Sequence, residues 1–183
     1  MVAPDNKKMD IVGSTELVEI SGAKNVPAKI DTGADSSAIW ASHIRVTKDG
    51  VLHFRLFDEG YPLYTGKAFK RTDFQAVAVR STSGHAQIRY RTYLRIVLKG
   101  RRIKALFNLT DRSKNSFPVL IGRRTIAGKF LVNVSEKNVS IPREKTKTKI
   151  VQKRLKEDPY KFHQKYIKKL SANPDNIKLK RKA

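Results

Sequence analysis

Short stretches in which apolar and polar residues alternate dominate the first 142 positions of the chain. The alternation is clear over residues 16–20 and 74–80, and a longer run over 86–98 has the same period of two. Asp49-Gly50 and Lys99-Gly100 separate neighbouring runs, as residues of tight hairpin turns do. The pattern therefore predicts many short strands, few helices, and an antiparallel β-barrel or sandwich.

Four further segments of this part of the chain carry local predictions. Residues 21–25 are expected to form a turn, and residues 26–30 are expected to form the strand that follows it. Residues 58–70 contain glycines without clear alternation and are expected to be irregular. A short helix is expected around residues 124–127.

The pattern changes after Pro142. Residues 143–149 are charged and short of apolar anchors, which is typical of a linker. Asp158 and Pro159 are a good helix start, with Asp as the cap and Pro at the first helical position. The expected organisation is a flexible N-terminus (1–9), a folded domain (10–142), and a basic tail (143–183) made of a linker, one short helix and a disordered tip.

Charge and composition narrow the class of protein. The 183 residues carry a formal net charge of +23, and the 41 residues of the tail contribute 15 basic and 4 acidic side chains. Such a field favours a polyanionic partner: nucleic acid, anionic lipid or an acidic polypeptide. There is no Cys, so disulfides and thiolate chemistry are excluded. No apolar run is long enough to span a membrane. The N-terminus also lacks the apolar stretch of a secretory signal, which favours a cytoplasmic protein.

One carboxylate lies in an unusual place, between two apolar runs. Asp31 ends the run that begins near Ala28, and Thr32-Gly33 then turns the chain into a second apolar run. Burying a charge is costly unless something compensates for it. Asp31 is therefore either paired for structural reasons or used for chemistry.

A second segment, Phe117-Pro-Val-Leu-Ile-Gly-Arg123, follows about ninety residues later. Together the two segments resemble the retropepsin-like aspartic proteases, in which Asp-Thr-Gly-Ala-Asp is paired with an Ile-Ile-Gly-Arg-type segment. More narrowly, the chain is similar to bacterial proteins once labelled ATP-dependent zinc proteases and now grouped with the retropepsins. The stretches that carry this narrower match are 28–41, 107–113 and 117–134, and the tail lies outside it.

The resemblance implies a closed β-barrel with Asp31 as the catalytic carboxylate at the bottom of a cleft. It implies that Thr32 ties its turn to a symmetry mate, and that Gly33 allows the tight turn and a close backbone approach that a side chain would block. Ala34 continues the same motif beside the catalytic turn. Gly122 is expected to let its strand pass against this turn.

Further site residues are implied in the same way. Asp35 and Arg123 match positions that form a partly buried ion pair beside the active site, where losing one partner would leave an uncompensated charge. Asp111, Arg112 and Ser113 also belong to the match. They either line the substrate groove or brace the cleft through an internal ion pair, and bracing is favoured.

Aspartic protease chemistry needs two carboxylates that share one proton. The chain contains a single Asp-Thr-Gly, so a functional site requires a homodimer in which Asp31 of each copy meets at a two-fold axis. The four histidines form none of the known zinc-protease motifs, and no phosphate-binding loop is present. No metal and no cofactor are expected.

The resulting hypothesis is a homodimeric aspartic endopeptidase that hydrolyses peptide bonds. The resemblance also suggests a link to proteins that trim glutamate tails added to a ribosomal protein by an ATP-grasp ligase. A positively charged cleft would attract such an acidic substrate. The alternative is a non-enzymatic module that associates with RNA or the ribosome through its basic tail, where aromatic and basic residues are interleaved.

Overall fold

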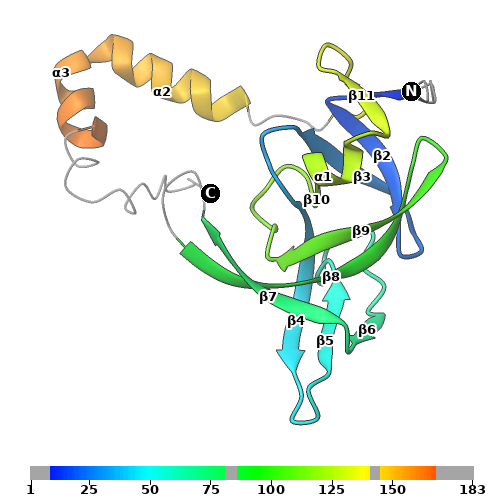
Figure 1. Cartoon of the computed structure of the whole chain (residues 1–183). Helices are drawn as coiled ribbons and strands as arrows, with labels where there is room; N and C mark the ends of the chain where they lie inside the picture. Colours follow the sequence, from blue (N-terminus) through cyan, green and yellow to red (C-terminus); the bar gives the residue numbers. More distant parts are fainter. Residues whose placement is uncertain (1–8, 81–85, 141–144, 168–183) are drawn as a thin grey trace. The chain divides into compact units, whose positions relative to one another are not determined.

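The computed structural model describes residues 9–80, 86–140 and 145–167. The chain divides into two compact units, Met1–Ile141 and Pro142–Ala183. Figure 1 shows that the first unit is built mainly of strands, with the short helix α1, and the second of helices. The flexible N-terminus and the disordered tip expected from the sequence lie outside the described residues, except for Met9.

The first unit contains strands joined mostly by short turns. The described strands are β1 (Asp10–Gly13), β2 (Thr15–Ile20), β3 (Ala23–Asp31), β4 (Ser37–Val46), β5 (Leu52–Leu56), β6 (Ala68–Arg71), β7 (Phe74–Arg80), β8 (Ala86–Leu98), β9 (Arg101–Thr110), β10 (Val119–Gly122) and β11 (Phe130–Asn133). The main sheet has the order β10-β3-β2-β8-β9-β4-β5-β6, with β7 paired to β8. β1 and β11 form a separate parallel pair.

Strand β10 closes this sheet into a barrel. It pairs in parallel with β3 on one side and antiparallel with β4 on the other, so β10-β3-β2-β8-β9-β4 forms a closed ring of six strands. The mainly β, closed-barrel fold predicted from the sequence is confirmed. Closure also places the ends of β3 and β10 side by side, which matters for the site described below.

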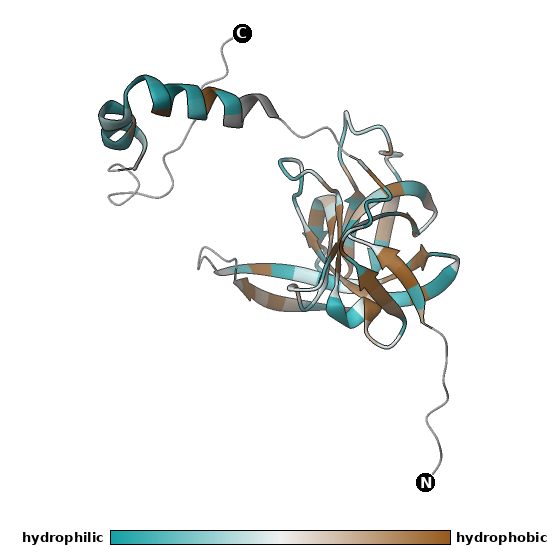
Figure 2. Ribbon diagram, turned by 90° about the horizontal axis from the view of Figure 1, so that it is seen from above, coloured by the Kyte–Doolittle hydropathy of each residue, from teal (hydrophilic) through white to brown (hydrophobic). Residues whose placement is uncertain are grey.

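Alternation along the strands produces the core. On β5 every second residue is buried, and on β8 Thr92 and the apolar residues Leu94, Ile96 and Leu98 are buried. The largest fully buried side chains include Phe54, Phe57 and Phe107, and burial of such apolar area is the main source of stability. In Figure 2 the strands carry long hydrophobic segments, whereas helix α2 (Lys145–Glu157) is mostly hydrophilic.

Two hairpins turn within two residues. Lys99 and Gly100 both have positive φ (48° and 76°), as type I′ turns require. Ser21 and Gly22 (φ 50° and 96°) make a similar turn, so the turn expected over residues 21–25 is present but ends at residue 22. β3 already begins at Ala23, because Asn25 with its positive φ lies opposite a shift in strand register instead of in a loop.

The irregular region expected over residues 58–70 also ends earlier than predicted. β6 pairs with β5 from Ala68 onward, with Phe69 stacked on Phe54 at 5.4 Å between ring centroids. Its exposure pattern is that of a short edge strand, which explains why alternation did not reveal it. The short helix expected around residues 124–127 is confirmed as α1 (Arg123–Ile126).

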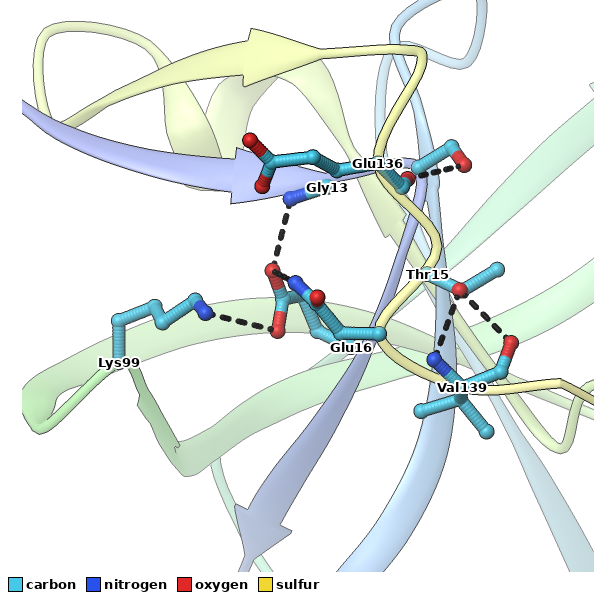
Figure 3. A network of polar contacts seen from close by, with 8 residues as sticks. Gly13, Thr15, Glu16, Lys99, Glu136 and Val139 are labelled. Carbon is cyan, nitrogen blue, oxygen red and sulfur yellow. Dashed lines mark hydrogen bonds and ion pairs between the residues drawn. The ribbon is translucent and has the colours of Figure 1, made fainter.

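A buried carboxylate fastens the end of this unit to the barrel (Figure 3). Glu16 is only 3% exposed; its Oε1 accepts hydrogen bonds from the Gly13 amide and the Asn138 side chain, each at 2.7 Å. Lys99 Nζ lies 3.4 Å from the other carboxylate oxygen. Beside it, the Thr15 hydroxyl donates to the Val139 carbonyl and accepts from the Val139 amide. Residues 136–139 are thus held both by these side chains and by two backbone hydrogen bonds, from the Ser14 amide to the Glu136 carbonyl and from the Asn138 amide to the Thr15 carbonyl.

The second unit is helical from an earlier point than predicted. α2 covers Lys145–Glu157, so residues 145–149 are not part of a linker. Lysine tolerates a helix well, and tail residues without apolar anchors can still be helical when they are exposed. α3 (Pro159–Phe162) begins as expected at Asp158, whose carboxylate accepts from the Lys161 amide at 2.8 Å, and a π-helix (His163–Ile167) continues it.

Candidate active site

The candidate catalytic carboxylate lies where β3 ends. Asp31 is paired with Gly122 at the last position of the parallel β3–β10 ladder and is half-buried. Its Oδ1 accepts the Gly33 amide at 3.1 Å, and its carbonyl accepts the Ala34 amide at 3.2 Å. The carboxylate is therefore held by the backbone of its own turn, while Thr32 and Gly33 at the tip are exposed.

Gly122 is the position at which this turn leaves no room for a side chain. A Cβ there would lie 2.5 Å from the Ser36 carbonyl carbon and 2.9 Å from the Ala34 oxygen. At Gly33 the nearest atom to a Cβ would be Asp31 Oδ1 at 3.5 Å, an ordinary contact. Within one chain, the close backbone approach expected at Gly33 is therefore wrong, and Gly122 supplies it.

A buried pair of hydroxyl groups, on Ser37 and Thr125, supports the Asp31 turn. Ser37 Oγ accepts the Gly122 amide at 3.1 Å and lies 2.7 Å from Thr125 Oγ1 of α1. Asn108 on β9 donates to Ser36 Oγ at 2.8 Å. These polar residues were missed as site residues in the sequence analysis. Asn108 gives a visible signal, because it is a single polar residue between Phe107 and Leu109, both fully or almost fully buried.

The structure brings Asp35 and Arg123 together. Arg123 Nε and Nη2 lie 2.7 and 2.6 Å from Asp35 Oδ1, and Arg124 Nη2 lies 2.7 Å from Oδ2. The hydrogen bond from Arg123 lowers the pKa of the Asp35 carboxyl. This ion pair is more open to solvent than expected, since the Asp35 side chain is 47% exposed, and Arg124 is a second partner that the sequence analysis missed.

The backbone at the start of α1 is tied to the same turn. The Arg123 amide donates to the Ala34 carbonyl at 2.8 Å, and the Arg124 amide donates to the Asp35 carbonyl at 3.3 Å. Ala34 thus accepts one backbone bond from α1 and donates another to Asp31. The turn and α1 are consequently held together both by backbone bonds and by the Asp35 ion pairs.

The Asp111-Arg112-Ser113 segment follows β9 and folds on itself. Asp111 Oδ1 accepts the Ser113 amide at 2.8 Å, which lowers the pKa of Asp111. Arg112 is half-buried and its Nε donates to the Phe117 carbonyl at 3.0 Å. Across the described residues no ion pair joins Asp111 to Arg112. The contacts that brace this loop are hydrogen bonds instead of the internal ion pair expected.

Arg112 also belongs to the electrostatic surroundings of Asp31. Burial lowers the pKa of Arg112, the positive charge of Arg89 lowers it further, and the Asp31 carboxylate opposes both. Arg89 lies on β8, is half-buried, and has a pKa lowered by burial. Arg112 therefore interacts electrostatically with both the candidate catalytic carboxylate and Arg89. The sequence analysis assigned no role to Arg89.

A family model described as "Retropepsin-like aspartic endopeptidase RimB" matches residues 11–143. The chain belongs to this RimB-like family. The match covers the whole barrel, including the Asp31 turn and Gly122, and ends before α2. The resemblance inferred from the motifs is thereby confirmed.

Two solved structures are similar to this chain, and the first of them shares its fold. Protein Lpg0085 from Legionella pneumophila, of unknown function, is 24% identical and aligns with 70% of this chain and 95% of its own at a TM-score of 0.54. EIAV protease in complex with the inhibitor HBY-793 is 17% identical, with 72% of this chain and 100% of that chain aligned at a TM-score of 0.38.

One curated relative is a longer protein. A "Probable alpha-L-glutamate ligase" from Shewanella pealeana is 30% identical over 138 residues, which are 72% of this chain. The chain spans about 30% of the length of that relative.

Neither a group of three metal-binding side chains nor a helix suited to cross a membrane is found among the residues that the structure describes.

Proposed function

We propose that the protein is an aspartic endopeptidase that acts as a homodimer. The observation that carries the proposal is the Asp31 turn: its carboxylate is held by the Gly33 amide, and its strand is packed against a Gly122 that admits no side chain. The chain has a single Asp-Thr-Gly, while the chemistry needs two carboxylates. Asp31 of a second copy is the natural partner, at a two-fold axis that the exposed tips of both turns would approach.

The proposed reaction is hydrolysis of a peptide bond by water. One Asp31 carboxylate is ionised and takes a proton from the water, and the water oxygen attacks the substrate carbonyl carbon. The other Asp31 is protonated and hydrogen-bonds to the carbonyl oxygen. The carbon–nitrogen bond then breaks as the amide nitrogen receives a proton, which leaves a free carboxyl group and a free amine. The carboxyl pair returns to one shared proton.

Acidic, glutamate-rich peptides are the substrate class we propose. The net charge of +23 attracts such peptides over a distance. Arg112 is near enough to Asp31 to interact with its carboxylate, so its guanidinium would bind a substrate side-chain carboxylate next to the scissile bond. The name of the Shewanella pealeana relative, a probable glutamate ligase, supports glutamate as the relevant residue.

Substitution of Asp31 tests the activity. Asp31→Asn keeps the size of the side chain and its acceptor oxygen for the Gly33 amide, so the fold should be retained while peptidase activity is lost. Asp73→Asn is the matched control, because Asp73 is exposed and lies outside the site. Full activity in the folded Asp31→Asn variant would refute the proposal.

Mixing the two chains tests the homodimer. When wild-type protein is equilibrated with Asp31→Asn protein, a site built from two copies loses activity as the square of the wild-type fraction. A site contained in one copy loses activity only in proportion to that fraction. A proportional decline, with subunit exchange verified by differently labelled chains, would contradict a shared site.

The substrate proposal is tested separately. Cleavage of oligo-glutamate and of a neutral peptide is compared over a salt series, and only the oligo-glutamate rate should fall steeply with salt. Arg112→Gln should lower kcat/KM for oligo-glutamate about tenfold more than for the neutral peptide, as the loss of one charge-assisted contact implies. Equal rates that ignore salt would refute the acidic substrate while leaving the peptidase itself intact.

A second candidate function is supported by helix α2. Lys149, Lys153 and Lys156 are exposed and line one shallow surface of this helix, and Lys153 lies 3.8 Å from Glu157. Such a row of lysines is suited to the phosphates of RNA. Loss of RNA binding in the triple Lys→Glu variant, with Asp31 dispensable for function, would favour a binding module over an enzyme.

A further inference from the structure

A second concave surface lies on the barrel away from the Asp31 turn. Its volume is about 820 Å³, and strands β2, β6, β8 and β9 contribute to it. Four of the residues that line it are basic, one is acidic and two are aromatic: Arg71, Arg95, Arg102, Lys104, Glu19, Phe69 and Tyr93. We call it the β8–β9 groove. It shares no residue with the candidate active site.

Strand register gathers three of the cations. Arg95 pairs with Lys104, and Val97 pairs with Arg102, so Arg95, Lys104 and Arg102 lie on the same face of the two strands. That face is opposite the one on which Leu94 and Ile96 are buried. Like charges placed directly opposite each other destabilise a sheet. Throughout the described part of the chain, no carboxylate lies within ion-pair distance of these groups, and Glu19 is the acidic residue in the groove.

Two aromatic rings lie among these cations. Lys104 Nζ is 4.8 Å from the centroid of the Tyr93 ring, and the Arg71 guanidinium is 5.8 Å from the centroid of Phe69. Phe69 is also stacked on Phe54, so its ring is engaged on the core side. Tyr93 is 41% exposed and keeps ring surface open to a ligand. The groove therefore offers positive charge beside an accessible aromatic ring.

We propose that the β8–β9 groove binds single-stranded nucleic acid. Arg95 and Arg102 would hold backbone phosphates through their guanidinium forks, and Lys104 would add a point charge. One base would stack on Tyr93. A positively charged groove with an exposed aromatic ring is the usual arrangement for binding single strands. Oligo-glutamate would use the cations but has no group that stacks on Tyr93, and this separates the two ligands.

Charge reversal in the full-length protein tests the phosphate contacts. Binding of a fluorescent oligo-uridine of about twelve nucleotides is measured by anisotropy, with oligo-deoxythymidine as the DNA counterpart. The variant R95E/R102E should bind both probes at least about tenfold more weakly, with a salt slope smaller by about two. Its matched control is R45E/K48E, which makes the same change in net charge on exposed residues of β4 and the hairpin after it.

If R95E/R102E and R45E/K48E lose the same affinity for the oligonucleotides, binding in the β8–β9 groove is refuted, because the overall positive charge of the protein would then explain binding. Full binding by R95E/R102E, with binding lost when the α2 lysines are reversed, would also refute it. Thermal unfolding of each variant checks that the barrel is intact.

Tyr93→Leu tests the stacked base independently of charge. This variant should bind the oligonucleotides about tenfold more weakly, because stacking on an aromatic ring is lost while every cation is retained. Its affinity for a labelled oligo-glutamate of equal charge should stay unchanged. If Tyr93→Leu binds oligonucleotides normally, or if oligo-glutamate binds the groove more tightly than they do, the proposal is wrong.

Discussion

Replacing Gly122 by alanine should disturb the barrel more than any other Gly→Ala change at the candidate site. The new Cβ would lie 2.5 Å from the Ser36 carbonyl carbon, whereas ordinary contact begins at 3.4 Å. The two backbones would therefore have to separate by about 0.9 Å, and neither is free to move. The Gly122 amide is bound to Ser37 Oγ, and the Arg123 amide is bound to the Ala34 carbonyl.

The expected cost follows from that geometry. Overpacking of a well-packed interior costs about 1–3 kcal/mol, and a contact between two hydrogen-bonded backbones belongs at the upper end, about 3 kcal/mol. With a urea m-value of about 2 kcal/mol/M, the unfolding midpoint should fall by about 1.5 M. Because Gly122 is paired with Asp31, part of the strain should also move the candidate catalytic carboxylate.

Urea unfolding followed by circular dichroism and by Trp40 fluorescence measures this cost. Gly33→Ala is the matched control: its Cβ meets only Asp31 Oδ1 at 3.5 Å, so its free energy of unfolding should change by less than about 1 kcal/mol. If Gly122→Ala unfolds within about 0.5 kcal/mol of the wild type, the strands separate without cost and the steric argument is wrong.

Two other predictions concern buried and exposed carboxylates. Glu16→Ala should lower the free energy of unfolding by about 3 kcal/mol, because it leaves the buried Gly13 amide without its acceptor. Glu16→Gln keeps that acceptor and should lower the free energy of unfolding clearly less. Equal losses for the two variants in urea unfolding would contradict this. Arg123 holds the pKa of Asp35 below its ordinary value of 3.8, so the ion pair stabilises the fold well above that pH, and its contribution is lost as the pH falls below 3.8 through the lower pKa of the folded state. Stability measured from pH 6 to pH 3 should fall less in Asp35→Asn than in the wild type; parallel curves would show that the pair contributes nothing.

The fold could be predicted largely because its strands are regular. Alternating residues fixed the buried faces of β5 and β8, and the turn residues at 99–100 marked a hairpin. The errors arose where local propensity competed with sheet pairing. Asn25 favours a turn, yet the sheet accommodates it as an irregularity, and exposed α2 has no apolar repeat strong enough to predict a helix.

Only some residues of the candidate site could be predicted from the sequence. Asp31, Asp35, Gly122 and Arg123 could be named because they belong to the two segments that resemble the retropepsin-like family, and the structure brings Asp35 and Arg123 together. The support given by Thr125 and the influence of Arg89 could not, since both arise from segments that are brought together only when the barrel closes.

The pairing of β3 with β10 has a consequence for how the protein is made. Ile30 and Ile121 are ladder partners although some ninety residues separate them, and the loop between them must be closed before the pair gains any stability. During synthesis the Asp31 turn therefore emerges long before the strand that holds it. The nascent chain therefore carries the Asp-Thr-Gly turn before its supporting strand, and the contacts of residues 136–139 with Thr15 and Glu16 are the last to form within the barrel unit. Because the ladder partner of Asp31 is Gly122, the turn can reach its folded geometry only after β10 has been synthesised.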